Sequence, residues 1–115
     1  MDTGKLSCAA LLLSGLAGIV MPERVAAALD LPAVSGRGRA EARAGLGGTY
    51  AALGGWALVS PDPAARVAVG VTWLGAAAAR LGSLVLDHPE TEPAFWVYLA
   101  AELGMGVAAL AGRKA

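Results

Sequence analysis

The chain has 115 residues, of which 57% are hydrophobic and 16% are charged, and its formal net charge at pH 7 is zero. Soluble domains have about 45–50% apolar and about 25% charged residues, so this composition favours a membrane protein. A neutral chain lacks the basic surface of a nucleic-acid-binding protein, and the single cysteine, Cys8, excludes an internal disulfide. The length predicts one domain over residues 1–115.

Four apolar stretches follow one another along the chain, divided by proline-rich or charged segments. A helix needs about 20 mostly apolar residues to cross a bilayer; the last three stretches reach that length and the first is marginal. Pro63 and Pro93 are placed for the first turn of a helix, where proline is favoured. The predicted spans are residues 5–21, 39–60, 63–87 and 93–112.

Between the first two spans, residues 25–32 (VAAALDLP) are too few to cross a bilayer and predict a short amphipathic helix at the membrane interface. The predicted fold class is therefore all-α: a four-helix transmembrane bundle with a short interfacial helix between helices one and two. A soluble alanine-rich bundle would show a charged face on each helix. Stretches such as AALLLSGLAGIV and VAVGVTWLGAAAA carry no charge.

Small residues recur four apart in every predicted span. Such residues suit membrane helix interfaces because they let backbones approach closely. The pairs are Ser14 with Gly18, Ala44 with Gly48, Gly75 with Ala79, and Gly104 with Ala108.

The orientation follows from the cations near the ends of the spans, since cytoplasmic loops carry an excess of Lys and Arg. One side has Lys5, Arg66, Arg113 and Lys114. The other side has Arg24, Arg37 and Arg39. The small excess on the first side predicts that both termini are cytoplasmic.

Charged residues also fall inside the predicted spans: Glu41 and Arg43 in the second, Arg80 in the third and Glu102 in the fourth. A charge at the bilayer centre costs at least about 2.5–3.5 kcal/mol, so such groups normally face inward and pair. We therefore expect Arg80 to pair with Glu41 or with Glu102; the sequence leaves both open. Arg43 lies near a helix end, from which its side chain could instead reach the headgroups.

Helical geometry groups polar residues around these charges, because positions seven apart nearly superpose. Such a cluster predicts a polar pocket in which a carboxylate performs acid–base chemistry on a lipophilic molecule. The candidate catalytic residues are Glu41, Glu102 and Asp87. The candidate substrate-binding residues are Arg80, Arg43, Trp73, Tyr98, His88 and Tyr50.

The same residues have purely structural interpretations. A pair between Arg80 and Glu102 would lock two helices in register. His88 precedes a proline, which is typical of a solvated turn, and Trp73 and Tyr98 would serve as interfacial anchors. No nucleotide-binding, haem or metal motif occurs in the sequence, so we expect neither a metal nor a cofactor.

The segments AEARAGLGGTYAALGGW, AAARLGSLVLDHPE and YLAAELGMG resemble a group of small bacterial four-helix membrane proteins catalogued as a domain of unknown function. The resemblance runs from Pro22 to about Gly112 and implies a four-span protein of the bacterial inner membrane, without supplying an activity. It includes Glu41, Arg43, Gly47, Gly48, Arg80, Asp87 and Glu102. In architecture alone, the chain is similar to four-helix membrane isomerases and cyclases that act on sterols and terpenes.

Three functions remain open on these grounds. The first is a membrane protein that binds or acts on a lipophilic small molecule, as an isomerase or cyclase would. The second is an accessory subunit whose charges only organise helix packing. The third is a small dimeric transporter, although the first span lacks the acidic residue typical of small multidrug exporters. The expected partners are the lipid bilayer, a lipophilic molecule and a second copy of the chain.

Overall fold

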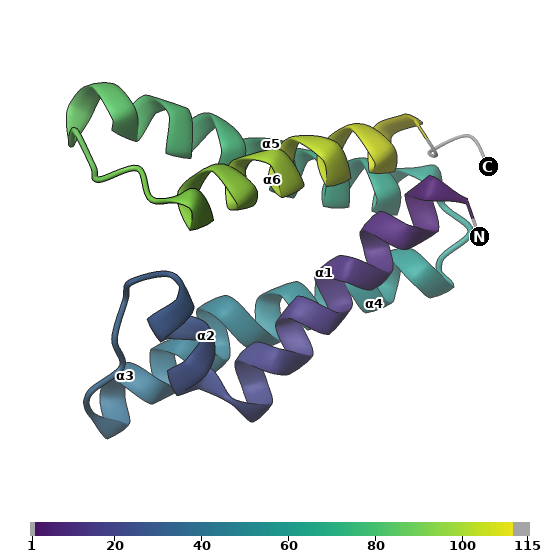
Figure 1. Cartoon of the computed structure of the whole chain (residues 1–115). Coiled ribbons are helices and arrows are strands. Elements are labelled where there is room, and N and C mark those ends of the chain that lie inside the picture. Colours follow the sequence, from purple (N-terminus) through teal and green to yellow (C-terminus); the bar gives the residue numbers. More distant parts are fainter. Residues whose placement is uncertain (1, 112–115) are drawn as a thin grey trace. The chain divides into compact units, whose positions relative to one another are not determined.

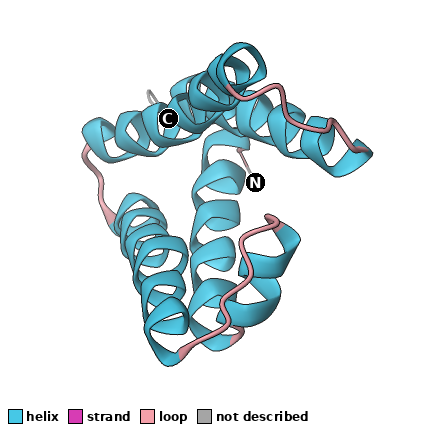
Figure 2. Ribbon diagram, turned by 90° about the vertical axis from the view of Figure 1, so that its left-hand side faces the viewer, coloured by secondary structure: helices cyan, strands magenta, loops and turns pink. Residues whose placement is uncertain are grey.

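The computed structural model describes residues 2–111, in which every regular element is a helix and no strand occurs, as Figure 2 shows. The all-α prediction is thus confirmed. The chain forms two compact units, one made of the residues up to Ser7 together with those from Asp62 onward, the other of Cys8–Pro61. In chain order the helices are α1 Thr3–Val20, α2 Pro22–Ala28, α3 Gly36–Glu41, η1 Ala42–Gly48, α4 Thr49–Val59, α5 Pro63–Leu86 and α6 Pro93–Ala111 (Figure 1).

The predicted helix starts at the two prolines are correct. Helix α5 begins at Pro63, and the Asp62 side chain caps it by accepting a hydrogen bond from the Ala64 amide at 2.9 Å. Helix α6 begins at Pro93. Gly112, the predicted end of the last span, and the cations Arg113 and Lys114 lie outside the described residues.

Three helices, α1, α5 and α6, are long and apolar enough to cross a membrane. The predicted second span appears instead as α3, η1 and α4, which follow one another without a gap. Glu41, Ala42, Gly48 and Thr49, at the junctions, all have right-handed helical dihedrals. The helical backbone is therefore continuous through these three elements, although its hydrogen-bond pattern changes within it.

The middle element, η1, is a π-helix of seven residues, ARAGLGG, where the sequence predicts a regular α-helix. A π-helix pairs residues five apart rather than four. The Thr49 hydroxyl follows the same spacing and donates to the Ala44 carbonyl at 3.0 Å. This segment contacts α1, since a Cβ atom added to Gly47 would lie 2.8 Å from the Ile19 amide nitrogen.

In the Cys8–Pro61 unit, α1 packs against η1 and α4 through glycine (Figure 1). A Cβ atom on Gly15 would overlap the Ala51 nitrogen, and one on Gly54 would lie 2.5 Å from the Leu12 nitrogen. Real Cβ atoms do not approach backbone so closely, so neither position can hold a larger residue without the helices separating. Backbone contact thus replaces the large side chains that this alanine-rich chain lacks.

In the other unit, α5 and α6 form an antiparallel hairpin (Figure 1). Gly70 of α5 faces Leu110, and Gly106 of α6 faces Leu74, in the register of such a hairpin. The start of α1, up to Ser7, belongs to this unit, and the Ser7 hydroxyl donates to the Met105 carbonyl at 2.7 Å.

Asp2, just before α1, accepts hydrogen bonds from the Lys5 amide at 2.7 Å and from Arg66 of α5 at 3.2 Å. The Lys5 bond, followed by the Arg66 charge, lowers the pKa of Asp2, although desolvation partly opposes this shift.

Of the predicted small-residue contacts, the one at Gly18 is confirmed, because an added Cβ atom would meet the Leu46 carbonyl. Gly75 and Gly104 behave differently: an added Cβ atom would find nothing within 4 Å among the described residues. The spacing of small residues four apart therefore located one helix interface correctly, but it did not distinguish buried glycines from exposed ones.

The short helix α2 begins at Pro22 and ends at Ala28, earlier at both ends than predicted. It ends in a Schellman motif, in which the Leu31 amide bonds to the Ala26 carbonyl at 2.8 Å and the Asp30 amide to the Ala27 carbonyl at 3.0 Å. Asp30 has the left-handed φ of 58° that this motif requires at a position usually held by glycine. The motif turns the chain sharply before Pro32.

We expect Gly15→Ala to lower the thermal unfolding midpoint in detergent, because its methyl group would collide with the α4 backbone. The matched control is Gly45→Ala, where an added Cβ atom has open space; alanine is a better helix former there by up to about 1 kcal/mol. Equal midpoints for the two variants would contradict the glycine-mediated packing of α1.

Candidate functional site

Arg80 and Glu102 form a two-point ion pair between α5 and α6. The Arg80 Nε donates to Glu102 Oε1 at 2.8 Å and its Nη2 donates to Oε2 at 2.9 Å. The Glu102 side chain is 10% exposed and that of Arg80 is 23% exposed. Of the two partners that the sequence left open for Arg80, the structure selects Glu102.

Two aromatic rings of α6 complete the surroundings of this guanidinium. The Arg80 Cζ lies 5.4 Å from the Phe95 ring centroid and 5.5 Å from that of Tyr98, within the range of cation–π attraction. Phe95, Tyr98 and Glu102 are three and four residues apart, so they share one face of the helix. These three side chains of α6 thus converge on a single cation, the Arg80 guanidinium.

The other candidates in this unit lie apart from the ion pair along α5. Trp73 has a buried indole N–H without a hydrogen-bond partner among the described residues. Asp87, at the end of α5, accepts a hydrogen bond from the Ser83 hydroxyl at 2.6 Å. His88 is exposed and has a left-handed φ of 47°, typical of the residue that ends a helix. The observed geometry of Asp87 and His88 is therefore that of a helix end, whereas Trp73 lies within α5.

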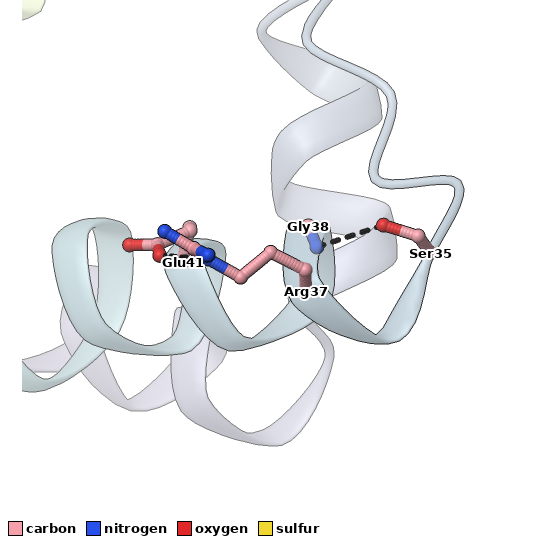
Figure 3. Close-up of polar contacts among 4 residues, drawn as sticks. All are labelled: Ser35, Arg37, Gly38 and Glu41. Atoms are coloured by element: carbon pink, nitrogen blue, oxygen red, sulfur yellow. Dashed lines mark hydrogen bonds and ion pairs between the residues drawn. The ribbon is translucent and has the colours of Figure 1, made fainter.

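Glu41 lies in the second unit, where it pairs with Arg37 one helical turn earlier (Figure 3). The Arg37 Nε lies 2.6 Å from Glu41 Oε2, and both side chains are largely exposed, at 85% and 64%. Ser35 starts this helix by accepting a hydrogen bond from the Gly38 amide at 3.0 Å. Exposed pairs of this kind contribute about 0–1 kcal/mol, so Glu41 is free to change partner.

Arg43 donates a hydrogen bond to the Ile19 carbonyl. That carbonyl belongs to the last turn of α1, whose acceptors have no partner within the helix. Arg43 therefore stabilises the end of α1, a contact within the protein that the sequence did not predict. Tyr50 is half-buried on α4.

A pocket of about 500 Å³ lies in this unit beside Glu41. Its lining residues are Ala26, Asp30, Leu31, Pro32, Ala33, Gly38, Glu41, Ala42 and Leu46. We call it the α2–α3 groove, because it lies where the Schellman turn after α2 faces the start of the α3–η1 helix. Its volume is typical of small-molecule sites, which range over about 300–1,000 Å³.

Asp30 of this groove was not among the residues predicted for the site. The sequence places it in the short helix predicted over residues 25–32, where it is the one acidic residue in the apolar run VAAALDLP. A single acidic residue within an apolar run is the feature of the sequence that points to Asp30 as a site residue. Its position beside Glu41 depends on the turn after α2, which the sequence did not locate.

We expect Arg80→Ala to lower the free energy of unfolding by about 3 kcal/mol, because it leaves the Glu102 carboxylate unpaired. The double variant Arg80→Met with Glu102→Leu should recover most of that loss, since it removes both charges. Arg37→Met, which breaks the exposed pair, is the control and should change stability by less than about 1 kcal/mol. Unfolding in mixed micelles measures the stability of all three variants. A double variant no more stable than Arg80→Ala would contradict the view that Arg80 serves only to pair with Glu102.

Comparison with known proteins places the chain in a family without an assigned activity. No curated protein and no solved structure matches it. The architectural likeness to membrane isomerases and cyclases therefore gains no support. A family model described as a domain of unknown function, DUF4345, matches residues 4–112, which include every predicted site residue. The chain belongs to the DUF4345 family.

Proposed function

We propose that this protein is a four-span component of the bacterial inner membrane that binds a lipophilic small molecule in the α2–α3 groove, with Glu41 as its acid–base group. The main observation in support of this proposal is the groove itself, a mainly apolar pocket of about 500 Å³ with a carboxylate in its wall. An apolar cavity with few polar groups is the usual form of a small-molecule site.

The membrane location is supported by the surfaces of the helices. Large apolar side chains are exposed along them, among them Leu13 at 64%, Val59 at 82% and Val85 at 74%. Exposed apolar surface on this scale is unfavourable in water and favourable in lipid. From Ala44 to Val59 the continuous second helix carries no charge, which supports it as a fourth span beside α1, α5 and α6.

The choice of Glu41 over Glu102 follows from their partners. Both oxygens of Glu102 accept hydrogen bonds from Arg80, so that carboxylate is committed to the helix pair. Glu41 has only an exposed partner and lines the groove. A general acid or base must come within hydrogen-bond reach of the bound molecule, and Glu41 meets that condition for a molecule in the groove.

An accessory subunit is the second candidate, favoured by the open glycines of the other unit. Gly75, Gly82 and Gly104 leave space above their backbones, as a close-packing partner helix requires. In that case the Arg80–Glu102 pair would only fix the register of α5 and α6.

For an even number of spans with cytoplasmic termini, Glu90 faces the outside and Pro61 the cytoplasm. We expect Glu90→Cys to react with a membrane-impermeant maleimide in intact cells and Pro61→Cys to react only after lysis. Both are made in a Cys8→Ala background, which must itself remain unlabelled. Labelling of both sites in intact cells would contradict four spans.

The groove hypothesis predicts that a lipophile co-purifies with the protein and is detected by native mass spectrometry. Ala33→Phe should displace it by filling the groove, whereas Ala40→Phe, exposed on α3 outside the groove, should retain it. Glu41→Gln should keep the unfolding midpoint of the unmodified protein, because its ion pair is exposed. A lipophile that persists in Ala33→Phe would place the site elsewhere.

A further inference from the structure

We infer that the ligand of the α2–α3 groove is a lipophilic amine, that is, an apolar body carrying a protonated nitrogen. This inference rests on the proposed function and specifies its ligand class. It follows from the charges of the groove wall, the geometry of the turn that carries Asp30, and the exposed partner of Glu41.

The wall of the groove is apolar except for its charges, and those charges have one sign. Of its lining residues, only Asp30 and Glu41 are ionisable, and both are acidic. A carboxylate accepts hydrogen bonds and donates none, so two of them select a head group that donates. An anionic head would be repelled, and a neutral hydroxyl would gain only a weaker hydrogen bond than a charged nitrogen.

Asp30 is held in place by the backbone. It occupies the left-handed position of the Schellman motif, and the amides of Asp30 and Leu31 are both hydrogen-bonded to α2. The side chain has no hydrogen bond or ion pair with any described residue. Leu31 and Ala26, which this motif brings together, line the same groove. The turn thus presents an unpaired carboxylate beside an apolar surface.

Glu41 already holds a cationic group, which shows the kind of head that its carboxylate accepts. That group is the Arg37 guanidinium, 2.6 Å away, which is 85% exposed and is not part of the groove wall. A protonated amine in the groove would compete with Arg37 for the same oxygen. Ligand binding then exchanges one cation for another at Glu41, and the released Arg37 side chain turns to solvent.

The experiment compares dodecylamine with dodecanol, two probes of equal chain length that differ in the head group. Binding to the full-length protein in an uncharged detergent is measured by titration with native mass spectrometry. We expect dodecylamine to bind about tenfold more tightly, the increment of a charge-assisted hydrogen bond.

The variants give the sharper test, because the inference predicts that some of them weaken dodecylamine binding and another strengthens it. Glu41→Gln and Asp30→Asn should each weaken dodecylamine binding, while Arg37→Gln, which removes the competitor, should strengthen it. Dodecanol binding should change little in all three. Asn tolerates the left-handed conformation of Asp30, so that variant preserves the turn. Glu90→Gln, an exposed acid outside the groove, is the control and should bind both probes as the unmodified protein does.

Equal binding of the two probes, both displaced by Ala33→Phe, would overturn the inference while leaving the proposed function in place. An amine preference that Glu90→Gln reduces as much as Glu41→Gln does would have the same effect. Weaker dodecylamine binding by Arg37→Gln would also overturn it. If neither probe binds, or if Ala33→Phe weakens the binding of neither, the groove is not a lipophile site. That result would remove the proposed function as well.

Discussion

Glycine allows the helices of this protein to approach closely, and both units depend on it: α1 meets neighbouring backbone at its glycine contacts, and α5 and α6 seat leucine side chains on theirs. The chain has a single phenylalanine and much alanine and glycine, so side chains alone cannot fill the space between helices. At Gly15 and Gly54 the neighbouring backbone occupies the volume of a Cβ atom. Such contacts gain dispersion energy over a large area without a hydrophobic driving force, which is the form of packing that works in lipid.

Close packing also determines where charge is tolerated. With α5 and α6 held together at Gly70 and Gly106, the long side chain of Arg80 crosses to Glu102 and lies against two aromatic rings. Because both carboxylate oxygens of Glu102 accept hydrogen bonds from Arg80, this ion pair suits a structural role. The pair of Arg37 with Glu41 in the α3–η1 helix is exposed instead, and only one Glu41 oxygen is engaged in it.

The groove is a product of two departures from regular helix. The Schellman turn ends α2, and the residues of and just after it, Asp30, Leu31 and Pro32, line the groove. Among the other lining residues, Ala42 and Leu46 belong to the π-helical segment, whose glycines also contact α1. Single π-helical turns are frequent at functional sites, and here the irregular segment contributes to the candidate site and to the core at once.

The sequence by itself determined the all-helical class, the starts of α5 and α6 and the family, because proline, apolar run length and short motifs act locally. It also identified Arg80 as a residue in need of an acidic partner. Only the tertiary structure decided that the partner is Glu102 and that Glu41 belongs to a different unit. Likewise it revealed the π-helical segment, the open face at Gly75 and the position of Asp30 in the wall of the α2–α3 groove. These features depend on which helices meet and at what register, and that is set by contacts between residues far apart in the chain, which local periodicity does not encode.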